Sequence, residues 1–132
     1  MSLTRLYRAA RVAFILLLSS APAHASDPVR VSVYPRFQNA PATVRVTLII
    51  EWDKDNRQAC LYIEGDMGYS RNSCWEHVGE GARYQTVIYY PDLPAGRYTA
   101  IAEVTRADHS TVRTRVEEFR LLGMNDSNND EP

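Results

Sequence analysis

Two cysteines are the side chains of this sequence best suited to covalent chemistry. Cys60 and Cys74 are the only cysteines among the 132 residues, so their pairing is unambiguous if they form a disulfide. Closing the short loop between them, about 15 residues, would stabilise a fold by roughly 3 kcal/mol. Thiolate ligation of a metal ion is the alternative, but the CxxC spacing of such ligands is absent. The spacing therefore favours a structural disulfide.

The histidines are the next candidates, because imidazole serves as a general base and as a metal ligand. Only His77 and His109 follow residue 25. Nucleophilic catalysis also needs a positioned nucleophile, and the sequence contains neither a G-x-S-x-G nor an H-E-x-x-H motif. With both cysteines in a disulfide, the sequence predicts a protein that is not an enzyme and uses no cofactor. A small hydrolase or metal-dependent enzyme is the second alternative.

An acidic turn at residues 53–56 could offer oxygen ligands to calcium. Asp53 and Asp55 alternate as in a calcium-binding loop, but the pattern of such loops fails after Asp55 because the following glycine and glutamate are absent. Asp and Asn are also common in ordinary turns. The sequence predicts no metal site and leaves calcium at this turn open.

Three aromatic residues form the candidate ligand surface. Trp75, Tyr69 and Tyr62 lie close to the two cysteines in the sequence. Exposed aromatic side chains on a secreted protein can stack on sugar rings or anchor a protein partner. Large aromatic side chains are more often buried, so the alternative is that Trp75 covers the disulfide. The candidate partners are an unknown protein or a glycan.

The elements that must position these residues are strands. Apolar residues occupy every second position from Val44 to Trp52, and successive side chains of a strand point to opposite faces. Polar residues fill most of the positions between them, as in an antiparallel sheet with one wetted face. The sequence predicts seven strands, at Val29–Tyr34, Thr43–Trp52, Gln58–Glu64, Tyr69–Val78, Ala82–Tyr90, Arg97–Arg106 and Thr111–Leu122, the last with a bulge at Glu117 and Glu118.

The first 25 residues indicate export. Three arginines precede the short apolar run Val12–Leu18, and Ala23-His24-Ala25 matches a cleavage site before Ser26. The run is far shorter than the ~20 residues of a membrane-spanning helix. We therefore predict a signal peptide over residues 1–25, a periplasmic or secreted location outside the cytoplasm, and no stable membrane anchor after cleavage.

The remaining chain is predicted to form one domain. Three of the fifteen basic residues lie in the signal peptide, which leaves twelve against sixteen acidic residues and a net charge of −4. This balance gives no support to nucleic-acid binding. Residues 26–123 are predicted to be the domain, and residues 124–132 a disordered polar tail whose single apolar residue, Met124, is too little to bury.

A short motif carries a resemblance to a known family. Leu93-Pro94-Ala95-Gly96-Arg97-Tyr98 resembles the turn into the sixth strand of immunoglobulin-like and fibronectin type III-like domains. The resemblance implies that the Tyr98 hydroxyl bonds to the backbone a few residues upstream, as in a tyrosine corner. The chain also resembles small secreted bacterial proteins of this type that have no assigned function. It departs from the immunoglobulin pattern because its cysteines are too close together to bridge the core.

These observations together predict an all-β fold, a seven-stranded antiparallel immunoglobulin-like β-sandwich. The predicted function is that of a secreted, non-catalytic binding or interaction module of unknown ligand. The first alternative is a carbohydrate-binding module that uses the exposed aromatic residues. A fold of this kind is compatible with many functions, so the ligand is not predicted.

Overall fold

The structure is a computed structural model that describes residues 26–124. The predicted signal peptide and the last eight residues of the predicted tail lie outside the described residues. Residues 26–124 form strands, turns and bends, without any helix. Over the same range, no helix long and apolar enough to cross a membrane is found.

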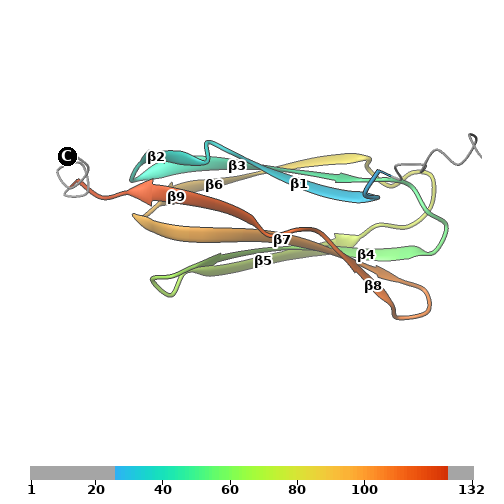
Figure 1. The fold of residues 1–132 in the computed structure, drawn as a ribbon. Coiled ribbons are helices and arrows are strands. Elements are labelled where there is room, and N and C mark those ends of the chain that lie inside the picture. Colours follow the sequence, from blue (N-terminus) through green and yellow to red (C-terminus); the bar gives the residue numbers. More distant parts are fainter. Residues whose placement is uncertain (1–25, 125–132) are drawn as a thin grey trace, which may run out of the picture.

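Nine strands make up the fold (Figure 1). They are β1 (Val29–Tyr34), β2 (Phe37–Asn39), β3 (Ala42–Ile50), β4 (Asn56–Gly65), β5 (Ser70–Glu76), β6 (Gln85–Leu93), β7 (Gly96–Arg106), β8 (Thr111–Arg113) and β9 (Glu117–Leu122).

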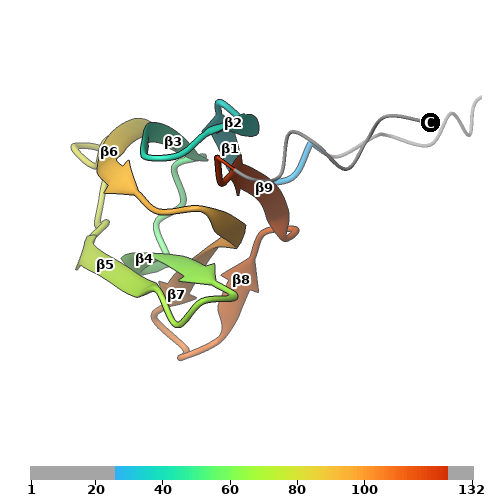
Figure 2. The same ribbon diagram turned by 90° about the vertical axis from the view of Figure 1, so that its left-hand side faces the viewer.

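The strands form two sheets that lie face to face. One sheet has the order β1-β3-β6, and the other has the order β2-β9-β7-β4-β5 with β8 also paired to β7. Figure 2 shows β3 and β6 in one layer and β4, β5 and β7 in the other. All pairs are antiparallel except β2 with β9, which is parallel. The all-β prediction is therefore confirmed, with nine strands in two sheets where seven were expected.

The core fills the space between the two sheets. In β3 every second side chain from Ala42 to Ile50 is buried, and in β7 every second side chain from Tyr98 to Val104 is buried. Burial of one aliphatic side chain of this size contributes roughly 1.5–3 kcal/mol. The two central strands therefore define an inner and an outer face for each sheet, and this fixes which side chains can reach solvent.

The predicted last strand is divided in two. Glu103 pairs with Arg113 in β8, whereas Tyr98 pairs with Phe119 in β9, so the register on β7 shifts by one residue between the two strands. The irregularity lies at residues 114–116, just before the Glu117–Glu118 pair where a bulge was predicted. Thr114 bridges it, since its Oγ1 accepts a hydrogen bond from the Ala102 N–H at 3.0 Å.

Several other strand boundaries differ from the prediction by one to three residues, and two of these differences have a clear physical reason. β3 ends at Ile50, and Trp52 is exposed rather than part of the buried face, because the chain turns at Asp53, whose Oδ1 accepts the Asp55 N–H at 2.8 Å. β6 continues through Pro91 to Leu93. β6 is an edge strand, and an edge position tolerates proline because one side of the strand has no partner to receive an N–H.

Candidate functional site

Cys60 and Cys74 form a disulfide between directly opposed residues of β4 and β5. Their Cα atoms are 4.1 Å apart. Ala59 and Leu61, the chain neighbours of Cys60, are fully buried in the core, so Cys60 points to the outer face of its sheet. Cys60 itself is 7% exposed, whereas Cys74 belongs to the exposed side of β5. The predicted disulfide is therefore present, and one of its two sulfur-bearing residues faces solvent.

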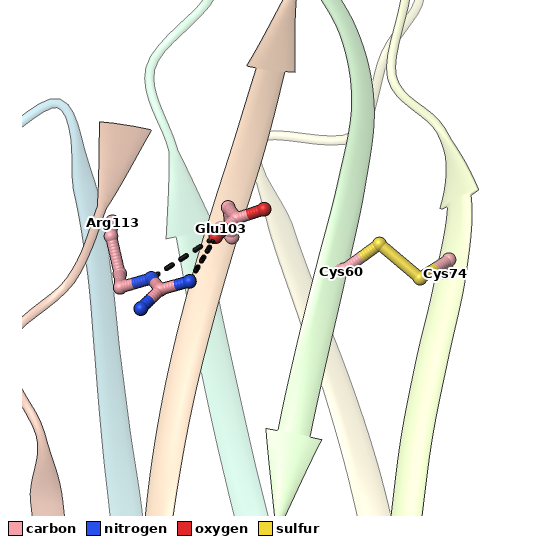
Figure 3. Close-up of a disulfide and its surroundings, with 4 residues drawn as sticks. All are labelled: Cys60, Cys74, Glu103 and Arg113. Carbon is pink, nitrogen blue, oxygen red and sulfur yellow. Dashed lines mark hydrogen bonds and ion pairs between the residues drawn. A yellow bond between two sulfur atoms is a disulfide. The ribbon is translucent and has the colours of Figure 1, made fainter. Parts of the chain in front are cut away.

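A carboxylate and a guanidinium continue the same cross-strand row. Cys60 lies opposite Glu103 of β7, and Glu103 lies opposite Arg113 of β8. Nε and Nη2 of Arg113 donate hydrogen bonds to Glu103 Oε2 at 3.0 and 2.7 Å (Figure 3). The Glu103 side chain is 17% exposed and the Arg113 side chain 65%. We call Cys74, Cys60, Glu103 and Arg113 the disulfide row.

The disulfide row joins the two predicted cysteines to Glu103 and Arg113, which the sequence did not indicate as their neighbours. Side chains directly opposite one another in an antiparallel pair have Cβ atoms about 4.5–5.5 Å apart, so the Cβ atom of Glu103 lies beside that of Cys60, while the Glu103 carboxylate is hydrogen-bonded to Arg113 on the neighbouring strand. An exposed ion pair of this kind contributes only about 0–1 kcal/mol to stability. The pair therefore contributes little to the stability of the fold.

The three aromatic residues of the predicted ligand surface do not share one face. Trp75 and Tyr69 are partly buried against the core, and Trp75 follows Cys74 in a strand, so it points to the opposite side of the sheet. Tyr62 is partly exposed on the outer face, two residues from Cys60. The structure therefore leaves Tyr62 alone beside the disulfide row.

Tyr98 is held by contacts on three sides. Its hydroxyl donates to the Pro94 carbonyl oxygen at 2.6 Å, its ring stacks on Phe119 with centroids 5.0 Å apart, and Tyr69 meets it edge-on at 5.7 Å. Burial raises the pKa of the Tyr98 hydroxyl, with smaller contributions from Tyr69 and Asp66, which keeps the hydroxyl protonated as a donor. The geometry implied by the resemblance at Leu93–Tyr98 is thus present locally.

The two histidines lie apart from the disulfide row. His77 is 2% exposed, with Nε2 3.0 Å from the Arg83 carbonyl oxygen and with Nδ1 unpartnered among the described residues. His109 is exposed in the turn between β7 and β8, where its φ is 65°. Asp53 of the acidic turn contacts Arg106 at 3.8 Å. Within residues 26–124, no three His, Cys, Asp or Glu side chains gather into a set able to hold a metal ion.

Comparison with known proteins gives a likeness of fold only. No protein-family model matches the chain, and no curated protein sequence matches it. The solved structure of a superoxide reductase (neelaredoxin) from Ignicoccus hospitalis is similar, with a TM-score of 0.56 and 11% identity over 71% of this chain and 80% of that chain. A single-residue variant of that reductase gives a TM-score of 0.54 and 14% identity over 74% of this chain and 82% of that chain.

This likeness corrects the predicted family, function and enzyme class. The similar structures are superoxide reductases, not immunoglobulin-like or fibronectin type III-like modules, and superoxide reductases are enzymes. The predictions of a non-catalytic binding module and of a protein that is not an enzyme are contradicted by this likeness. The Leu93–Tyr98 motif led to the wrong family because a tyrosine hydrogen-bonded to a carbonyl four residues upstream stabilises only the local turn. It does not determine how nine strands pair.

Proposed function

We propose that this protein has a redox function outside the cytoplasm, carried out by thiol–disulfide exchange at Cys60–Cys74. The observation that carries the proposal is the disulfide row, where a disulfide with one solvent-facing residue shares a cross-strand row with the Glu103–Arg113 ion pair. The likeness to superoxide reductases supports a redox role for this fold. The predicted signal peptide supports the location, since disulfides form and persist outside the cytoplasm.

Reduction of superoxide itself is not proposed for this chain. That reaction takes one electron and two protons for each superoxide, so it calls for a one-electron centre such as a redox-active metal ion. His77 Nε2 faces a backbone carbonyl, His109 lies in an exposed turn, and both cysteines are bonded to each other. The residues between 26 and 124 thus do not fit a metal centre, and no metal-dependent step is derived.

Exchange would begin at Cys74, the accessible sulfur, because access decides which sulfur is attacked. A thiolate of a partner dithiol attacks Cys74 Sγ, the partner–Cys74 bond forms, and the Cys60–Cys74 bond breaks. Cys60 leaves as a thiolate and takes up a proton. The second thiol of the partner then attacks the partner sulfur of the mixed disulfide and releases Cys74. The partner becomes a disulfide, and this protein gains two electrons and two protons.

Glu103 and Arg113 would act as positioning residues for this step. A carboxylate beside a developing thiolate opposes it, because like charges disfavour each other at short range. Arg113 compensates the charge of Glu103 through its two hydrogen bonds. The row thus presents Cys60 with a nearly neutral neighbour, which favours departure of the Cys60 sulfur.

The exchange rate of the native, exported chain with dithiothreitol tests the proposal. We expect Arg113→Gln to slow reduction about two- to fivefold, since it leaves Glu103 uncompensated and an exposed pair is worth about 0.2–1 kcal/mol. Glu103→Gln should speed reduction by a similar factor. Arg115→Gln, outside the row, is the control for the change in net charge. Reduction only after unfolding would rule out a redox role for this disulfide, and equal rates in all four proteins would rule out the positioning role of Glu103 and Arg113.

The partner in this proposal is a protein dithiol outside the cytoplasm rather than a glycan or a nucleic acid. The net charge of −4 expected after cleavage supports leaving out nucleic acid.

We also propose that the fold is a β-sandwich of the superoxide reductase type. The single core shared by two facing sheets supports this description.

A further inference from the structure

A cleft of about 600 Å³ lies on the six-stranded sheet, at a distance from the disulfide row. Its walls come from the end of β4, the start of β7, the middle of β9 and Arg36 between β1 and β2. Glu64 of the cleft is four residues beyond Cys60 on β4, which corresponds to about 13 Å along a strand. The cleft is therefore a separate place on the molecule.

Two arginines of the cleft oppose each other without compensation. Arg97 of β7 pairs with Arg120 of β9 in the register, and both side chains are exposed. Like charges directly opposite in a sheet are destabilising. Among residues 26–124, neither guanidinium has an ion pair or a hydrogen bond to another side chain. The fold thus maintains two adjacent, unpaired cations in a concave surface.

The other charges of the cleft have different surroundings. Arg36 is paired with Glu117, and Asp66 accepts a hydrogen bond from the Arg97 backbone N–H at 3.0 Å. Glu64 and Glu118 flank Thr99 across the strands, two residues along from Arg97. This separation is about 7 Å along the strand direction. A cationic row and an acidic row therefore lie side by side in one cleft.

We propose that this cleft binds a small molecule through a carboxylate or phosphate group held between Arg97 and Arg120. Two guanidinium groups present planar, multiple donors that match the oxygens of either anion. The acidic row would face the remainder of the ligand, so an ammonium group there is favoured and a second anionic group is disfavoured. The ligand class is a small molecule with one carboxylate or phosphate group and no second anionic group, with or without an ammonium group. This site goes beyond the redox proposal and does not depend on it.

Titration of the exported chain with three probes, followed by amide chemical shifts, tests the site. The probes are inorganic phosphate, succinate and 4-aminobutanoate. We expect 4-aminobutanoate or phosphate to shift amides of β7 and β9 around Arg97 and Arg120, with succinate at least threefold weaker than 4-aminobutanoate. Tighter binding of 4-aminobutanoate than of phosphate would identify carboxylate as the recognised group, and tighter binding of phosphate would identify phosphate.

Variants separate recognition from structure. Arg97→Gln and Arg120→Gln should each weaken binding at least fivefold while melting no lower than wild type, because each removes half of a repulsive pair. Arg115→Gln, an equal charge change outside the cleft, should bind as wild type does. Absence of saturable shifts with all three probes, or equal affinities in the wild type and both cleft variants, would overturn the proposal.

Discussion

Two cross-strand rows on the outer face of one sheet differ in how their charged side chains are paired. In the disulfide row, Glu103 stands opposite Arg113 and the pair is closed by two hydrogen bonds. In the cleft, Arg97 stands opposite Arg120 and neither guanidinium has an acidic partner among the described residues. Opposed unlike charges contribute roughly 0.2–1 kcal/mol, whereas opposed like charges cost stability.

The difference shows that alternation along a strand determines which face a side chain lies on, but it does not determine which residue lies opposite. Alternation along β7 puts Arg97 and Glu103 on the same outer face. Register alone gives one a compensating neighbour and the other a repelling neighbour. We interpret the compensated row as the place of disulfide exchange with a partner protein, and the uncompensated row as a binding place for a small anion.

Removing the disulfide should have the largest effect on stability. The Cys60→Ser, Cys74→Ser double variant loses a crosslink that closes a loop with a sequence separation of 14, so its free energy of unfolding should fall by roughly 3 kcal/mol. Urea unfolding at equilibrium measures this. Hydrogen exchange should show faster opening of β5, the polar edge strand, than of β3. An unchanged unfolding midpoint would show that the row does not constrain the fold.

Tyr98, which lines the cleft, gives the second largest effect. Tyr98→Phe removes the donor to the Pro94 carbonyl, and the loss of one such buried hydrogen bond should cost about 1–2 kcal/mol. Tyr89→Phe is the matched control, since the Tyr89 side chain is 62% exposed. Thermal unfolding of both variants measures the difference. Equal losses in the two variants would mean that the Pro94 bond contributes nothing.

The smallest effect is expected in the turn between β7 and β8. Hydrogen bonds from the Ser110 side chain and backbone lower the pKa of the Asp108 carboxyl. Because the pKa of Asp108 is lower in the folded state, its ionised carboxylate stabilises the fold at pH values above the unfolded-state pKa. This stabilisation is lost as the pH falls through the folded-state pKa. Ser110→Ala should therefore raise the pKa of Asp108 towards its ordinary value, measured by carboxyl chemical shifts against pH. Ser32→Ala, on β1, should leave that titration unchanged.

The strands of the core could be predicted from the sequence because their side chains alternate. β1 begins and ends as expected, and β3 and β7 differ by one or two residues at their ends. β2 could not be predicted, since Phe37–Asn39 has no alternating pattern and its pairing with β9 is made by residues far along the chain. The division of the last strand likewise depends on where β7 offers partners.

The candidate site could be predicted only in part. The cysteine pair followed from its count and from the export signal, but the position of Glu103 beside Cys60 depends on the register between β4 and β7. Non-local pairing sets that register, and no local motif encodes it. The pairing of Arg97 with Arg120 could not be predicted either, because it also depends on a non-local register. Trp75 was a candidate ligand residue because it is an aromatic residue next to Cys74, but its side chain is partly buried against the core.

The reduction potential of Cys60–Cys74 tests the central claim most directly. The native exported chain would be equilibrated with glutathione and dithiothreitol buffers, and free thiols would be counted after acid quenching. A redox-active disulfide should have a potential above about −300 mV, because purely structural disulfides typically lie below that value. We predict a value above it for the native protein. A potential below it, with reduction occurring only together with global unfolding, would contradict the redox function.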